Sequence, residues 1–310
     1  MPPFPKLPPK AAYLSLNNPS RRNALSLAVL QDLRNQLHSF NTSPKDGKLC
    51  ILPRFQPSIL DKLEAAHAKT DPQAVGEYSW LLDSSAWRCH RHGLPNVLVL
   101  RSSGPVFSAG HDLAELRTLS HEDVERTFAL CAEVMALIRR SPAPVIGAVQ
   151  GLATAAGCQL AMTTDLPVAK AETMFRLPGA SLGLPCTSPS TAVSRRVGNA
   201  AAFRMLATAE PVRADQLPAG SVDVVADDEA FEARIADLVD QFATRTPAQP
   251  QALGKWAFWT QASFQRGDGG DGYEEAVSWA GRMMALHARG DDSREGMQAF
   301  SEKRKPEWKT

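Results

Sequence analysis

The chain has 310 residues, and its 34 Lys and Arg residues nearly balance its 33 Asp and Glu residues. The formal net charge of +1 gives no global positive field of the kind that draws a protein to nucleic acid. No apolar run approaches the roughly 18 residues of a membrane-spanning helix, and the five widely spaced cysteines form no C-x-x-C pair, which indicates free thiols in a reducing compartment. The length suits one large core or two modest domains.

The first elements are a strand and a helix. Residues 12–16 alternate between apolar and polar side chains, which predicts a strand, and residues 26–40 predict a helix with Ser26 as its N-cap. From residue 41 to residue 95 the character changes, because prolines interrupt the chain and only one helix, over residues 58–69, can be drawn. This stretch is too long for an ordinary loop, so we expect an insertion with small elements of its own.

The remaining elements alternate between strands and helices and then become helical. Unbroken apolar runs predict buried strands over residues 96–102 and 143–151, and a capped apolar stripe predicts a helix over residues 120–140. Short strands at 166–171 and 173–177 are followed by helices at 201–209, 228–246, 274–288 and 293–304. This order predicts an α/β core over residues 11–210, with the insertion at about 41–95, and a helical region over residues 211–310.

Two stretches repeat one arrangement, in which an apolar strand leads through a turn of small residues into a helix. They are "VLVLRSSGPVFSAGHDLAEL" at residues 97–116 and "PVIGAVQGLATAAGCQLAMTTD" at residues 144–165. The first N–H groups of a helix have no internal partner, and small residues let a ligand approach them closely. Two such turns indicate two donors that converge on one oxygen gaining negative charge. The alternative is that the small residues only allow tight helix packing.

These motifs resemble those of the enoyl-CoA hydratase/isomerase (crotonase) superfamily. "LNNPSRRNALS" is similar to its first coenzyme A loop and "REGMQAFSEKRKPEWK" to its C-terminus, so the resemblance covers nearly the whole chain except residues 41–95. Within the superfamily, "GLATAAGCQL" and the later "PG" are most similar to the group of enoyl-CoA hydratase domain-containing protein 3. The resemblance implies an α/β crotonase (ClpP-like) fold, which is a β-β-α spiral with a C-terminal helical trimerisation region, and a homotrimer or dimer of trimers.

The resemblance also implies roles for particular residues. Two backbone N–H groups, at His111 and Ala156, would hold the thioester oxygen of an acyl-CoA so that an enolate can form, and Gln159 would orient water or substrate. Coenzyme A is part of the ligand, so no separate cofactor is expected, and no metal is expected because "CHRH" at residues 89–92 matches no tetrahedral zinc motif. The implied coenzyme A contacts are Arg22, Ala24, Leu25, Ser108, Ala109, Phe300 and Lys303.

At three positions where the resembling enzymes have a carboxylate, this chain has another residue. Gln159 and Gly179 replace the two glutamates of hydratases, and Thr187 replaces an acid of dienoyl-CoA isomerases. An amide can orient water but cannot take its proton, and loss of a general base typically costs about 10²–10⁴-fold in rate. We therefore expect an acyl-CoA-binding protein of fatty acid metabolism, nominally an enoyl-CoA hydratase/isomerase, with little hydratase turnover. The alternative is a non-catalytic acyl-CoA-binding or regulatory protein of lipid metabolism.

Three other side chains leave further reactions open, namely hydrolysis, decarboxylation and isomerisation. The imidazole of His111 is a competent base near neutral pH, unless only its backbone N–H serves. Cys186 is either a nucleophile or a buried inert thiol. Arg176 either pairs with a second carboxylate on the acyl group or points to solvent.

The expected partners are acyl-CoA and further copies of the chain, with no nucleic acid and no membrane span. The first 31 residues hold four basic residues and no acid, which is compatible with a mitochondrial address. They are rich in proline and lack an amphipathic Arg/Ser-rich helix, so a short extended leader is the alternative. The resemblance implies a mitochondrial protein, with the cytoplasm and the peroxisome still open.

Overall fold

The computed structural model describes residues 4–262, 272–274, 277, 278, 281, 285, 288 and 291–307. In these residues a sheet of five parallel strands has the order β1-β2-β3-β5-β8. The expected strands of this sheet are present, and β8 was not expected from the sequence. The strands are β1 (Ala11–Leu16), β2 (Val97–Ser102), β3 (Val145–Val149), β5 (Leu166–Lys170) and β8 (Asp223–Val225).

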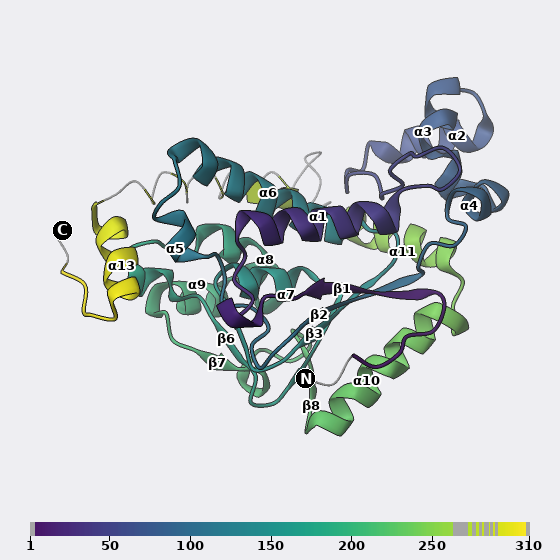
Figure 1. The fold of residues 1–310 in the computed structure, drawn as a ribbon. Coiled ribbons are helices and arrows are strands. Elements are labelled where there is room, and N and C mark those ends of the chain that lie inside the picture. The colour runs from purple at the N-terminus through teal and green to yellow at the C-terminus, as the bar shows by residue number, and fades with distance from the viewer. Residues whose placement is uncertain are drawn as a thin grey trace.

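Both faces of this sheet are buried at its centre, which explains the unbroken apolar runs of β2 and β3. Along β2, Leu98 and Leu100 face the hydrophobic core that contains α1 (Leu27–Asn41) and α6 (His121–Arg140), whereas Val97 and Val99 face the other way, toward α10 (Asp228–Asp240). Figure 1 shows α1 and α6 on one side of the strands and α10 on the other. The sheet is therefore the middle layer of a three-layer α/β arrangement.

A second, smaller sheet runs beside the first and makes the chain a spiral. Its strands have the order β4-β6-β7, and single bridges extend it through Ser108 with Ala153 and through Leu25 with His111. Each turn of the spiral thus has one segment in the large sheet, one in the small sheet and then a helix, as in β3, β4 and α7. The bounds are β4 (Leu152–Thr154), β6 (Met174–Arg176), β7 (Val212–Arg213) and α7 (Ala156–Thr163).

The stretch from residue 41 to residue 95 carries three short helices rather than the single expected one. They are α2 (Ile59–Ala68), α3 (Pro72–Leu82) and α4 (Ser84–His90). Trp80 stacks on Trp87 at 5.8 Å between ring centroids, and these helices enclose a separate hydrophobic cluster that also takes in Trp256 of α11 (Ala248–Gln261). In Figure 1 this group lies at the opposite end of the molecule from α13 (Asp291–Glu302).

The other helices complete the spiral and the C-terminal region. The expected helices at 201–209 and 293–304 are present as α9 and α13, and the one at 228–246 is α10 followed by a π-helical turn. The expected helix at 274–288 lies largely outside the described residues, and α8 and α11 were not expected. No helix in the described part of the chain is long and apolar enough to cross a membrane. The remaining bounds are α5 (Leu113–Leu116), α8 (Thr187–Val197), α9 (Asn199–Thr208), η1 (Pro19–Arg21), η2 (Pro178–Leu182), η3 (Ala214–Gln216) and η4 (Gln241–Arg245).

Candidate functional site

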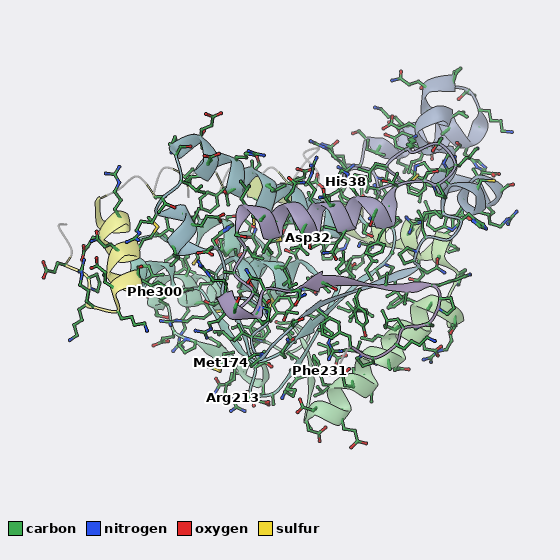
Figure 2. All side chains as sticks on the ribbon, viewed as in Figure 1. Asp32, His38, Met174, Arg213, Phe231 and Phe300 are labelled. Carbon is green, nitrogen blue, oxygen red and sulfur yellow. The ribbon has the colours of Figure 1, made fainter. Side chains whose placement is uncertain are left out.

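A cavity of about 500 Å³ opens where the small sheet meets the C-terminal helix. It is lined mainly by apolar side chains from α5, β6, η2 and α13, and both small-residue turns reach it. Figure 2 labels two lining residues from distant parts of the chain, Met174 on β6 and Phe300 on α13. The walls thus come from segments far apart in the chain, which is why the cavity is not evident from any one segment of the sequence.

The two turns that reach the cavity are in direct contact with each other. Hydrogen bonds fix the first one, since Leu25 N–H donates to the carbonyl of Gly110 over 2.7 Å. Gly110 has a φ of 84°, and a Cβ placed on it would lie 2.8 Å from the Cβ of Ala155 and 3.3 Å from the backbone nitrogen of Ala156. Only glycine allows this backbone conformation and this approach together.

The second turn contains a strained residue. Ala155 has a φ of 50° and a ψ of −123°, a conformation that favours glycine, and its N–H donates to the carbonyl of Arg176 over 2.9 Å. The strain directs the chain from β4 into α7, so that Ala156 becomes the first residue of the helix. Its N–H therefore has no intrahelical partner and carries partial positive charge.

His111 and Ala156 both line the cavity, and in the described part of the chain neither backbone N–H donates a hydrogen bond. The contact between the two turns brings both groups to the same cavity. Such a pair of fixed donors stabilises negative charge that develops on a carbonyl oxygen.

The imidazole of His111 is buried and neutral. Its ring packs edge-on against Phe128 at 4.8 Å between centroids, and its Nδ1 lies 3.3 Å from the carbonyl oxygen of Leu25. Burial lowers the pKa of His111 to about 4, although this hydrogen bond opposes the shift. At neutral pH the ring is uncharged, and a base with so low a pKa is a poor acceptor of a substrate proton.

Gln159 lies behind the cavity rather than in its lining among the described residues. Its side chain is fully buried, and its Nε2 donates to the hydroxyl of Ser188 on α8 over 3.2 Å. The expected role in orienting water or substrate stays a prediction, because in this conformation the amide is turned toward α8.

Gly179 and Cys186 touch each other at the side of the cavity formed by η2. The N–H of Gly179 donates to the sulfur of Cys186 over 3.2 Å. A Cβ at Gly179 would lie 2.6 Å from the backbone nitrogen of Cys186 and would overlap the carbonyl oxygen of Leu184, so no side chain fits there. Burial raises the pKa of Cys186 to about 12, so its thiol stays protonated, in keeping with an inert thiol rather than a nucleophile.

None of the described residues that line the cavity is an Asp or a Glu. In the same residues no group of three or more His, Cys, Asp or Glu side chains is placed to hold a metal ion. Asp112 is the nearest acid in sequence to the first turn, and it caps α5 and forms an ion pair with Arg21 at 2.6 Å. The site therefore offers hydrogen-bond donors without a carboxylate that could move a proton.

The seven residues expected to contact coenzyme A fall into two groups. Arg22, Ala109 and Phe300 line the cavity, and Phe300 is 61% exposed. The others do not: Ala24, Leu25 and Ser108 are buried behind the first turn, and Lys303 is an exposed residue just beyond α13.

The C-terminal helix α13 closes one side of the cavity by contact between backbones. A Cβ at Gly296 would overlap the carbonyl oxygen of Leu182 and lie 2.7 Å from its carbonyl carbon, so α13 rests directly on η2. Sequence reasoning missed Met174 and Leu182 as lining residues. Strand alternation is a signal for the first, because Met174 and Arg176 are two residues apart on β6 and share a face.

The comparisons with known proteins decide the family. A family model described as enoyl-CoA hydratase/isomerase matches residues 91–310. The mitochondrial enoyl-CoA hydratase domain-containing protein 3 of Danio rerio is 34% identical over 94% of this chain and 82% of its own length. The chain belongs to the enoyl-CoA hydratase/isomerase family.

Further comparisons support the same family. The Homo sapiens protein of the same name is 32% identical over 94% of this chain and 78% of its own length. The crystal structure of human enoyl coenzyme A hydratase domain-containing protein 3 has a TM-score of 0.61 at 30% identity, and that of a Mycobacterium smegmatis enoyl-CoA hydratase has a TM-score of 0.61 at 34% identity. Each comparison covers 98% of both chains. The expected family and its α/β spiral fold are confirmed.

Proposed function

We propose that this family member binds acyl-CoA thioesters, with the thioester oxygen between the N–H groups of His111 and Ala156, and that it serves fatty acid metabolism. The observation that carries the proposal is a pair of N–H groups that have no hydrogen-bond partner among the described residues and that belong to two touching turns on one apolar cavity. Arg22, Ala109 and Phe300 then contact the coenzyme A portion of the ligand. The acyl chain lies along the apolar lining.

The same site supports weak hydratase chemistry. Two fixed donors lower the energy of an enolate, but hydration also requires a group that takes a proton from water and one that handles the α-proton. With no carboxylate in the described lining, a His111 pKa of about 4 and a Cys186 pKa of about 12, no such group is poised near neutral pH. We therefore propose that the protein binds acyl-CoA and hydrates it very slowly. If it does not hydrate acyl-CoA at all, its role is binding or regulation.

Titration calorimetry with a panel of acyl-CoAs, paired with product analysis, tests the proposal. We expect clear binding and very slow hydration of crotonyl-CoA. A rate comparable to that of two-glutamate hydratases would contradict the weak-hydratase part.

The variant Ala156→Pro tests the donor, because proline is accepted at the first position of a helix and lacks the N–H. It should weaken acyl-CoA binding while leaving free coenzyme A, which has no thioester carbonyl, unaffected. A thermal melt of the variant checks its folding. Equal affinity of variant and parent for acyl-CoA would argue against the donor role.

We also propose a mitochondrial location and a homotrimer. The location rests on the names of the Danio rerio and Homo sapiens relatives. The homotrimer rests on the resemblance to the crotonase superfamily alone. Import into isolated mitochondria and light scattering of the purified protein test the two points.

A further inference from the structure

Arg176 places a cation in the wall of the apolar cavity. It belongs to β6, where it pairs in register with Thr154 of β4. Its carbonyl accepts the N–H of Ala155, so its backbone adjoins the turn that presents the N–H of Ala156. Within β6, Phe175 turns into the core, whereas Met174 and Arg176 line the cavity.

The guanidinium of Arg176 is only partly satisfied by the protein. Its Nε donates to the carbonyl of Ala209 over 2.7 Å. Its two terminal nitrogens form no hydrogen bond and no ion pair within the described residues, and the described cavity lining contains no Asp or Glu. The neighbouring thiol of Cys186 is protonated and supplies no negative charge.

Such an arrangement favours an anionic ligand. A cation that faces an apolar cavity loses hydration without gaining a counter-ion. The planar fork of arginine matches a carboxylate with two parallel hydrogen bonds, which are among the strongest in proteins. A carboxylate on the ligand would therefore supply the counter-ion that the cavity lacks.

We propose that Arg176 binds a carboxylate carried by the acyl group, and that the preferred ligands are coenzyme A thioesters of short dicarboxylic acids. The inference rests on the proposed acyl-CoA function. The carboxylate is only a few bonds from the thioester carbonyl, because Arg176 is the strand neighbour of the turn that holds this carbonyl. Arg22, from the loop before α1, is a separate and exposed cation for the coenzyme A phosphates.

Calorimetry with matched thioesters tests the inference. Succinyl-CoA and butyryl-CoA have acyl chains of the same length and differ in the terminal carboxylate. The parent should bind succinyl-CoA about 10- to 100-fold more tightly, the range given by charged hydrogen bonds of about 1.5–3 kcal/mol. Arg176→Met, which keeps an unbranched stem, should remove the preference, and Arg176→Lys should retain part of it.

A matched control is Arg213→Met on the adjacent strand β7. Arg213 pairs with Asp215 at 2.8 Å, does not line the cavity and is labelled in Figure 2. This variant should leave all affinities unchanged. Thermal melts of each variant separate loss of the ligand contact from loss of the Ala209 hydrogen bond.

Three other outcomes would each count against the inference. A parent protein that binds butyryl-CoA and succinyl-CoA equally would overturn the inference and leave the proposed function intact. If Arg176→Met weakens both thioesters and free coenzyme A to the same extent, Arg176 serves the phosphates and the inference is wrong. Failure of the parent to bind any thioester would refute the proposed function and this inference together.

Discussion

The Nε2 of Gln159 donates a hydrogen bond to the hydroxyl of Ser188 over 3.2 Å, and both residues are buried. This bond joins α7, which begins at the second turn of the cavity, to α8. The resemblance to hydratases implies a glutamate at the position of Gln159. In this chain the residue at that position links two helices.

Ser188→Ala should lower the free energy of unfolding by about 1–3 kcal/mol, because it leaves a buried amide without its partner. Gln159→Leu together with Ser188→Ala should cost less than the sum of the two single changes. Urea denaturation measures these values, and Ser190→Ala on the same helix is the control. If Ser188→Ala instead changes acyl-CoA affinity at unchanged stability, Gln159 acts on the ligand.

Gly179→Ala should destabilise the protein by about 1–3 kcal/mol, the usual range for forced overpacking, because its Cβ meets the backbone of Leu184 and Cys186. Gly179→Glu should be at least as damaging and should not restore hydration of crotonyl-CoA. The control is Gly76→Ala within α3, where no atom lies within 4 Å of the new Cβ. That change should stabilise by about 0.5–1 kcal/mol. If Gly179→Ala and Gly76→Ala had equal melting temperatures, the Cβ at residue 179 would not clash with the neighbouring backbone.

His111 should make stability depend on pH. Its pKa is about 4 in the folded protein and 6.5 in the unfolded chain, so between these values only the unfolded chain takes up a proton. The free energy of unfolding therefore falls as the pH drops from 6.5 to 4, by an amount of the order of 3 kcal/mol. His111→Gln keeps the backbone N–H and should flatten this slope in denaturation curves at pH 7, 5.5 and 4.5. Parallel slopes for parent and variant would show that the imidazole titrates normally.

A thiol reagent should modify one cysteine of the native protein and five after denaturation. Cys89 is exposed, whereas Cys50, Cys131, Cys158 and Cys186 are buried. Burial also raises the pKa of Cys131 and Cys186 to about 12, so their reactive thiolates are scarce. Cys89→Ser should reduce the native count to zero. Rapid native modification of Cys186, located by mass spectrometry, would reopen its role as a nucleophile.

The central strands β2 and β3 of the large sheet were predictable because they are buried on both faces and read as apolar runs. The edge strand β8 was missed, because it is short and only partly buried. The strand β4 was missed as well, since Leu152–Thr154 is short and lies in a segment whose small residues indicate a turn and a helix. The helices α3 and α4 were also missed, because Trp80 and Trp87 form their cluster through a contact that no local period reveals.

The candidate site was predictable only in part. Motif resemblance located both turns, and the cavity lining includes His111 and Ala156. The positive φ of Ala155 could not be expected from an alanine, and the orientation of Gln159 depends on Ser188, which is distant in sequence. Side-chain orientation and backbone strain are set by tertiary contacts, which sequence patterns do not encode.

The tight surroundings of Gly179 bear on how acid–base chemistry could be added to this site. A glutamate at that position would clash with the backbone of Leu184 and Cys186. Any side chain there requires these backbone segments to move, so one substitution is not enough. Thr154 and Ser181 line the cavity and already carry side chains. A designed general base is therefore better placed at one of these two positions than at Gly179.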